Sequence, residues 1–282
     1  MDGKIANIII LAGQSNAVGV GTVEYLPNNY GRDEVEQFTR GYEKVQIDYT
    51  SHDMKSNGFV NTSIRCTERT RDTFGPEVGM ARKLAQMYPN DEFFIVKCAF
   101  GGSDMNSNWR SPASGVPFCE EMVPDVEHAI HDPALWFPGW CYNALIRQLR
   151  ESIERLKSKG YEPRIKAFCW MQGESDSAED HCADPYIERY DGLLRDLQAA
   201  FPAYFSEDTT FVDAGISEIW DNYQRMNARK KAYAQEKGYR FIDTIAAGLT
   251  TKNEPFEAPD IYHYDCTSTI QLGELFVEEI FK

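Results

Sequence analysis

The sequence predicts a single α/β domain in which a parallel β-sheet is covered by helices on both faces. Short apolar runs alternate along the chain with segments whose apolar residues repeat at helical spacing. No linker rich in Pro, Gly or Ser, no internal repeat and no low-complexity segment divides residues 1–282. At 42% hydrophobic residues, the chain can bury a sizeable core.

Five short apolar runs are the predicted strands. Each is rich in β-branched or aromatic residues, and the more continuous runs are typical of strands that are buried on both faces. The runs are Ile5–Leu11, Glu92–Cys98, Arg164–Met171, Thr210–Ile216 and Tyr239–Asp243.

Five helices are predicted between or after these strands. Pro76–Tyr88 has a proline in its first turn, where proline is favoured. Apolar residues repeat at helical spacing in three others, two of which are followed by the stop signals Gly160 and Pro202. The other helices are Leu145–Leu156, Ile187–Phe201, the charged Asn222–Lys237 and Leu272–Ile280.

Two regions, residues 20–73 and 103–138, fit no element and are expected to be long loop insertions. Both are polar, and both contain scattered Gly, Pro, Asn and aromatic residues. Long loops in compact domains are often functional, and both regions follow glycine-containing turns at strand ends. The alternative is that they only decorate the surface.

The charge balance limits the classes of partner. Lys and Arg number 29 against 44 Asp and Glu, which gives a formal net charge of −15. Such a chain repels polyanions, so nucleic acid and anionic membranes are poor partners and a neutral substrate suits it better. No stretch approaches the roughly 20 apolar residues of a membrane span. The N-terminal apolar run is short for a signal peptide, so a cytoplasmic location is expected. The oligomeric state stays open.

The cysteines and histidines do not suggest a metal site. The seven cysteines are odd in number and include no Cys-x-x-Cys pair, which argues against a disulfide framework or a zinc ribbon. Cys98 and Cys169 are expected to be small buried hydrophobic residues. His128 and His131 lie near Asp125 and Glu127, but the His-x-x-His spacing is loose for zinc and no third ligand is evident.

Polar and glycine-containing turns follow three of the predicted strands. In an open parallel sheet, ligands bind beyond the carboxyl ends of the strands, so these turns are expected to meet on one rim. The turns are residues 12–19, 99–104 and 170–176, and the late segment Asp260–His263 is expected to join them.

Ser15 is the candidate nucleophile, because a turn between a strand and a helix exposes a serine hydroxyl. A serine needs a base, and His263 has a carboxylate three residues before it, so Asp260 could fix its tautomer. Asp265 is the rival acid, less well placed at two residues after His263. Taken alone, Ser15 could simply cap a turn and His263 could be a surface histidine.

A triad also needs an oxyanion hole, and three donors are candidates. They are the backbone N–H of Ser15, a glycine N–H from Gly101–Gly102, and the side-chain amide of Gln172. The simpler alternatives are a plain tight turn at the glycines and an ordinary loop amide at Gln172.

The order of these blocks resembles a known family. The blocks are Gly13–Asn16, Lys97–Ser103, Trp170–Asp176 and Asp260–His263, accompanied by Gly75–Glu77, Trp109 and Gln271–Gly273. They resemble the SGNH hydrolase superfamily, and more narrowly its sialate O-acetylesterase branch, carbohydrate esterase family 6, which is acetylxylan esterase-like. The third block of the wider superfamily carries an Asn, whereas this branch has the Gln-Gly-Glu form found here. The resemblance covers nearly the whole chain.

The resemblance implies a flavodoxin-like three-layer sandwich with about five parallel strands. It also implies a serine esterase that hydrolyses acetyl esters on a carbohydrate through an acetyl-enzyme, with no cofactor and no metal. The implied triad is Ser15, His263 and Asp260, and the implied oxyanion hole is formed by Ser15, Gly102 and Gln172. The supporting or substrate-side residues are Gln14, Asn16, Glu77, Lys97, Trp109 and Glu174.

Three other interpretations stay open. Glu174 and Asp176 could be a glycosidase pair, although two loop carboxylates are more often hydrogen-bonding scaffolds, and Glu174 is expected to orient neighbouring loops. A non-catalytic carbohydrate-binding module could share the fold, but retention of Ser, His and Asp argues against it. A lipase or thioesterase would need an apolar acyl tunnel, which the polar loops do not suggest.

Overall fold

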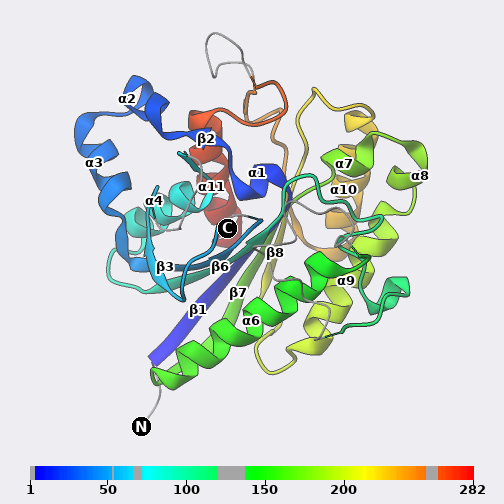
Figure 1. Ribbon diagram of the computed structural model, residues 1–282, viewed down its shortest axis with the longest axis horizontal. Helices are drawn as coiled ribbons and strands as arrows, with labels where there is room; N and C mark the ends of the chain where they lie inside the picture. Colours follow the sequence, from blue (N-terminus) through cyan, green and yellow to red (C-terminus); the bar gives the residue numbers. More distant parts are fainter. Residues whose placement is uncertain (1–3, 53, 66–71, 120–136, 252–259) are drawn as a thin grey trace.

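The computed structural model describes residues 4–52, 54–65, 72–119, 137–251 and 260–282. Within these ranges a seven-stranded sheet has the order β4–β3–β6–β1–β7–β8–β9 (Figure 1). Neighbouring strands are parallel except β3 and β4. The strands of this sheet are β1 Lys4–Gly13, β3 Tyr42–Thr50, β4 Val60–Thr62, β6 Phe93–Ala99, β7 Tyr161–Met171, β8 Thr210–Ala214 and β9 Arg240–Ile242.

A second, two-stranded antiparallel sheet and the helices complete the described elements. The small sheet consists of β2 Gly21–Thr22 and β5 Thr73–Phe74. The helices are α1 Ser15–Val18, α2 Leu26–Asn29, α3 Arg32–Arg40, α4 Glu77–Met87, α6 Trp140–Ser158, α7 Glu174–Ser177, α8 Asp180–Ala183, α9 Tyr186–Ala200, α10 Tyr223–Lys237 and α11 Cys266–Ile280, with 3₁₀ turns at Val23–Tyr25 and Pro112–Ser114.

The predicted α/β fold with its mainly parallel sheet is confirmed. All five predicted strands exist, as β1, β6, β7, β8 and β9, and the five predicted helices are α4, α6, α9, α10 and α11. The interpretation of residues 20–73 as a loop insertion is wrong, because this segment contributes β3 and β4 to the central sheet. Residues 103–119 are turns and one 3₁₀ turn, and the remainder of the second predicted loop lies mostly outside the described residues.

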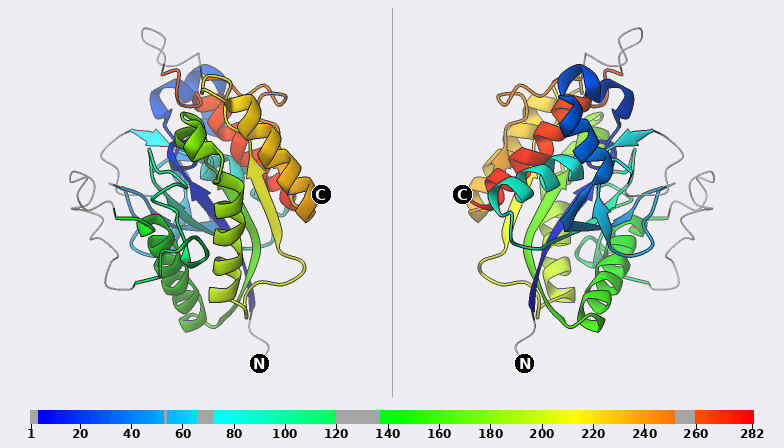
Figure 2. Two further views of the ribbon diagram at one scale, coloured as in Figure 1. Left: turned by 90° about the vertical axis from the view of Figure 1, so that its right-hand side faces the viewer. Right: turned by 90° about the vertical axis from the view of Figure 1, so that its left-hand side faces the viewer.

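The sheet is the middle layer of the molecule. Helix α6 packs on β6 and β7 from one side, and α11 contacts α4, β8 and β9 on the other (Figure 2). The helices α4 and α11 approach closely because each has a glycine at the contact. A Cβ atom on Gly79 would lie 1.9 Å from the Ile270 carbonyl oxygen, and one on Gly273 would lie 1.9 Å from the Pro76 carbonyl oxygen.

The core follows from strands that are covered on both faces. Ile8, Ile9, Ile10 and Leu11 in β1 are fully buried, and every residue of β6 is buried. Consecutive burial, rather than alternation, is what a central strand between two helix layers requires. Cys98 and Cys169 are free and buried, as predicted. Burial raises the pKa of both thiols.

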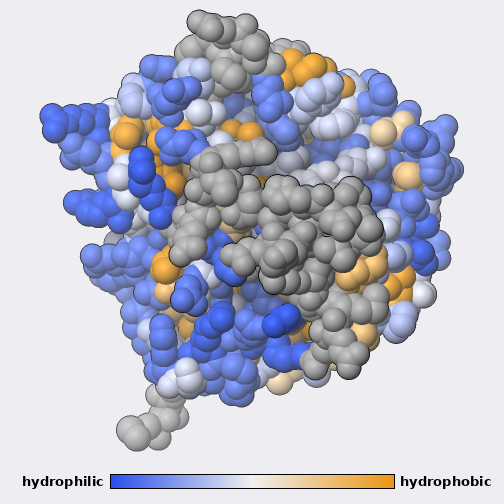
Figure 3. Space-filling view, viewed as in Figure 1, coloured by the Kyte–Doolittle hydropathy of each residue, from blue (hydrophilic) through white to orange (hydrophobic). Residues whose placement is uncertain are grey.

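One face of the molecule, viewed as in Figure 1, is mainly hydrophilic at its described residues. On the face shown in Figure 3, apolar side chains form small separate patches among polar ones. Among the described helices, none is long and apolar enough to cross a membrane.

Candidate functional site

Three strand ends meet at one rim, and their register places the predicted turns together. Gly13 pairs with Ala99 of β6 on one side and with Met171 of β7 on the other. Gly13 has φ +145°, and a Cβ atom there would lie 1.9 Å from the Met171 carbonyl oxygen, so only glycine allows this approach. The chain then turns into α1, whose first residue is Ser15.

His263 and Asp260 reach this rim from the segment before α11. The Nδ1–H of His263 donates to Oδ2 of Asp260 at 2.6 Å, which leaves Nε2 on the other side of the ring. Burial opposes ionisation of Asp260, but the hydrogen bond and charge of His263 and nearby backbone N–H groups hold the pKa of Asp260 below its usual value. Asp265 has another task, because its carboxylate accepts from Ser268 N–H at 2.8 Å and caps α11.

A pocket of about 590 Å³ brings the candidate residues together. Its lining includes Ser15, Gly101, Gly102, Asp260 and His263. A Cβ atom on Gly101 would lie 3.7 Å from Cβ of Ser15, so the glycine turn runs directly beside the serine.

The backbone N–H groups of Ser15 and Gly102 are available at this pocket. Within the described part of the chain, neither N–H donates to a carbonyl or to a side chain. Gly102 has φ +69°, a conformation that favours glycine. Backbone donors without acceptors on the wall of one pocket are what a developing oxyanion requires.

Gln172 is not at the pocket, which corrects the expectation that its amide faces the oxyanion. The side chain is fully buried, and its Nε2 donates to Asp176 Oδ2 at 2.6 Å and to Gln14 Oε1 at 3.1 Å. The Ser103 carbonyl lies 3.3 Å from the same nitrogen. An amide nitrogen has two hydrogens, so these acceptors already use its donors.

Gln14 and Asn16 connect the serine turn to its neighbours. Gln14 Oε1 also accepts from Ser175 N–H, and Gln14 lies on the pocket lining. Asn16 Nδ2 donates to Glu174 at 2.9 Å, while its Oδ1 accepts from Tyr264 N–H at 3.0 Å. Asn16 therefore ties the turn that carries Ser15 to the residue that follows His263.

Glu174 and Asp176 are buried scaffolds, and neither lines the pocket. Glu174 bonds Asn16, and burial raises its pKa. Asp176 accepts from the N–H groups of Met105 and Asn106. These contacts do not resemble a glycosidase pair facing a substrate.

Glu77, Lys97 and Trp109 lie behind the pocket. Lys97 is fully buried, forms an ion pair with Glu77 at 2.5 Å and donates to the Val18 carbonyl at 2.7 Å, at the end of α1. The Trp109 indole donates to Ser103 Oγ at 2.8 Å, and that hydroxyl donates to the Phe100 carbonyl. These residues hold α1, which begins with Ser15, and the turn that contains Gly101 and Gly102 from the side away from the pocket.

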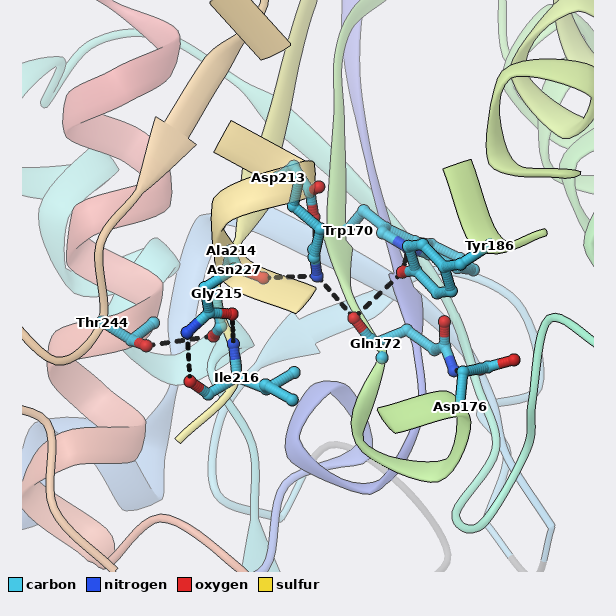
Figure 4. A network of polar contacts seen from close by, with 12 residues as sticks. Trp170, Gln172, Asp176, Tyr186, Asp213, Ala214, Gly215, Ile216, Asn227 and Thr244 are labelled. Atoms are coloured by element: carbon cyan, nitrogen blue, oxygen red, sulfur yellow. Dashed lines mark hydrogen bonds and ion pairs between the residues drawn. The ribbon is translucent and has the colours of Figure 1, made fainter. Parts of the chain in front are cut away.

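Sequence reasoning missed a buried lysine that joins β7 to β8. Lys230 of α10 donates to the carbonyl oxygens of Ala214 and Gln172 at 2.7 and 2.5 Å. It also forms an ion pair with Asp213 at 3.1 Å. Figure 4 shows this network, in which Tyr186 also donates to the Gln172 carbonyl. The charged pattern of the helix gave no sign that one lysine points inward.

Three further pocket residues were also missed. His52 lies just after β3, and its Nε2 is 3.0 Å from the Gly101 carbonyl oxygen. Trp220 and Tyr262 form an aromatic pair at the rim, with ring centroids 5.3 Å apart, and Tyr262 is 52% exposed.

The alternation of Val45, Ile47 and Tyr49 with polar residues was the available sequence signal for β3, and so for the position of His52 directly after it.

Metal ligands do not gather in the part of the chain that the structure describes. There, no group of three or more His, Cys, Asp or Glu side chains is arranged to hold an ion. His128 and His131 lie outside the described residues.

Solved structures share this fold over almost the whole chain. NanS is 16% identical with a TM-score of 0.67, covering 100% of this chain and 98% of its own. A protein from Arabidopsis thaliana is 18% identical with a TM-score of 0.62, covering 98% and 97%. A carbohydrate acetylesterase from Xanthomonas citri is 13% identical with a TM-score of 0.61, and the match covers 96% of this chain but 55% of that one. No curated protein gave a significant sequence match.

The fold is a mainly parallel sheet covered by helices on both faces, and the ordered sequence blocks meet in one pocket at the carboxyl ends of its strands. Residues 5–282 match the family described as carbohydrate esterase, sialic acid-specific acetylesterase. The chain belongs to this family and is a carbohydrate esterase.

Proposed function

We propose that the protein is a serine esterase that removes acetyl groups from a carbohydrate through an acetyl-enzyme. The observation that carries the proposal is the shared pocket of Ser15 and His263, with the His263 Nδ1–H bonded to Asp260 at 2.6 Å. This contact sets the tautomer in which Nε2 can accept a proton from a serine hydroxyl.

The reaction needs two steps. Ser15 Oγ attacks the acetyl carbonyl carbon while His263 Nε2 takes the hydroxyl proton. The tetrahedral intermediate then releases the sugar alkoxide, to which His263 returns the proton. Water, deprotonated by His263, attacks the acetyl-enzyme in turn and frees acetate and Ser15. The N–H groups of Ser15 and Gly102 stabilise the oxyanion in both steps.

Gln172 contributes indirectly in this scheme. Its bonds to Gln14 and Asp176 hold the serine turn against the turn after β7. We therefore assign it a positioning role and leave oxyanion binding to the two backbone donors.

The rim supports a sugar as the alcohol part of the ester. Trp220 and Tyr262 present aromatic surface beside His263, and Tyr262 is more than half exposed although it is a large side chain. Exposed aromatic side chains such as Tyr262 offer an apolar face against which the C–H-bearing face of a sugar ring can pack.

Replacement of Ser15 tests the proposal. Ser15→Ala should lower kcat on an aryl acetate by roughly 10³-fold or more, because only binding and the oxyanion donors remain. Ser51→Ala changes another serine on the pocket wall and is the matched control. An organophosphonate should label Ser15. An active Ser15→Ala enzyme, or labelling of another serine, contradicts the assignment, and a folded wild-type protein without turnover supports a binding module.

A further inference from the structure

The turn after β3 lies beside the glycine turn because their strands are neighbours. Strands β3 and β6 run parallel, and Thr50 pairs with Cys98. Continuing this register by two residues places His52 opposite Phe100. The two rings pack edge to face at 5.5 Å, and the His52 ring also contacts Trp140 at 5.8 Å.

The polar contact of His52 has a defined direction. Its Nε2 is 3.0 Å from the Gly101 carbonyl oxygen, and a carbonyl oxygen can only accept. The ring nitrogen must therefore carry a hydrogen, which sets Nε2–H as the donor at this position.

The carbonyl of Gly101 and the N–H of Gly102 belong to one planar peptide unit. A donor on the oxygen therefore fixes the plane that aims the N–H at the other end. It also polarises the unit, since hydrogen bonds in a chain strengthen one another by about 10–30% per bond. Gly101 and Gly102 lack side chains, so packing of their own cannot fix this plane.

We propose that His52 is a positioning residue that orients and polarises the Gly101–Gly102 peptide as an oxyanion donor. The inference rests on the proposed function, because it assumes that charge develops on the substrate oxygen beside Ser15. In this assignment His52 acts through the Gly101–Gly102 peptide and not directly on the reacting atoms. Its effect should appear in the transition state more than in substrate binding.

Two substitutions separate the hydrogen bond from the packing. His52→Phe keeps a ring against Phe100 and Trp140 but cannot donate. His52→Gln loses the ring but its Nε2–H₂ can reach the same carbonyl. We expect His52→Phe to lower kcat by about 10- to 100-fold, short of the 10²–10³-fold loss of a whole donor, with KM changed less than about twofold. His52→Gln should restore most of kcat.

Labelling by an organophosphonate gives a second readout, because the phosphoryl oxygen would occupy the oxyanion position. The labelling rate of His52→Phe should fall in parallel with kcat, while its thermal unfolding midpoint stays near that of the wild type. Full activity in His52→Phe, or a loss in His52→Gln with none in His52→Phe, overturns the proposal. Ser15→Ala distinguishes the two failures: if it remains active, the proposed function has failed, and if it is inactive while His52→Phe is not, only the role of His52 has.

Discussion

Asp260 and Asp265 flank His263 and have different surroundings. Asp260 accepts the His263 Nδ1–H, whereas Asp265 accepts a backbone N–H at the start of α11. Spacing in the sequence pointed to Asp260, because a carboxylate three residues before a histidine can turn back onto its ring. The structure shows this contact already formed between Asp260 and His263.

Two asparagine substitutions should separate these tasks. Asp260→Asn should lower kcat by roughly 10³–10⁴-fold, because an amide allows the wrong imidazole tautomer. Asp265→Asn should leave kcat and stability nearly unchanged, since Asn caps a helix about as well as Asp. Steady-state kinetics on an aryl acetate check both, and the reverse order of the two losses would mean that Asp265 is the functional acid.

Gln172 shows what sequence patterns cannot decide at the scale of a residue. The motif places its backbone at the rim, but the direction of its side chain depends on how the chain leaves β7. Gly173 has φ +134°, a conformation that L side chains rarely adopt, and the turn directs Gln172 to Asp176 below the pocket. No spacing rule contains that information.

At the scale of elements, the sequence predicted the strands and helices with strong apolar patterns and missed those in residues 20–73, among them β3 and β4 of the central sheet. Strand β3 lies in a long polar region with scattered Gly, Pro, Asn and aromatic residues, and it carries a buried carboxylate, Asp48, near its end. The structure shows why a buried carboxylate is tolerated there. Asp48 pairs with Arg155 at 2.6 Å and accepts from Ser152 at 2.8 Å, both on α6. Those partners are about a hundred positions away in the sequence.

Gln172→Ala tests the role of this side chain in joining the turns after β1, β6 and β7. The substitution leaves Asp176 with one donor fewer in a buried site, which should lower the free energy of unfolding by about 1–3 kcal/mol. Gln172→Glu has the same shape but sets a second carboxyl against Asp176, so it should be the more destabilised variant near neutral pH. Urea unfolding at pH 7 measures both.

A role of Gln172 as an oxyanion donor would affect kinetics and not stability. If Gln172→Ala unfolds at the same urea concentration as the wild type, but its kcat falls about 10²–10³-fold with KM unchanged, then Gln172 is an oxyanion donor after all.

At the scale of the whole molecule, buried carboxyl groups make the free energy of unfolding depend on pH, and their contribution falls as pH rises. Burial raises the pKa of Asp176 from 3.8 to about 7, against the opposing backbone and Gln172 hydrogen bonds, and that of Asp213 to about 6. The folded state thus holds the Asp176 proton more tightly than the unfolded chain does. Its contribution to stability is fully present below pH 3.8 and is lost as pH rises to about 7.

Asp176→Asn removes this titration. The variant should be less stable than the wild type at acidic pH, because an Asn nitrogen would face the Gln172 donor. Its deficit in the free energy of unfolding should shrink between about pH 4 and pH 7, since only the wild type loses stability through this group. Urea midpoints at several pH values give the two curves, and a deficit that stays constant or widens with pH contradicts the assignment. Asp213 is present in both proteins, so its titration contributes equally to both curves and does not affect their difference.

The bond between Asn16 and Tyr264 joins positions 248 apart in the sequence. A ribosome makes the chain from its N-terminus at about 5–20 residues per second, so Ser15 is synthesised well before His263, its proposed base. Under the proposed mechanism, a growing chain carries a serine that nothing can deprotonate. In this scheme, hydrolysis also needs the segment with His263, which is made later. If the proposed triad is correct, the order of synthesis keeps the unfinished protein from cleaving esters.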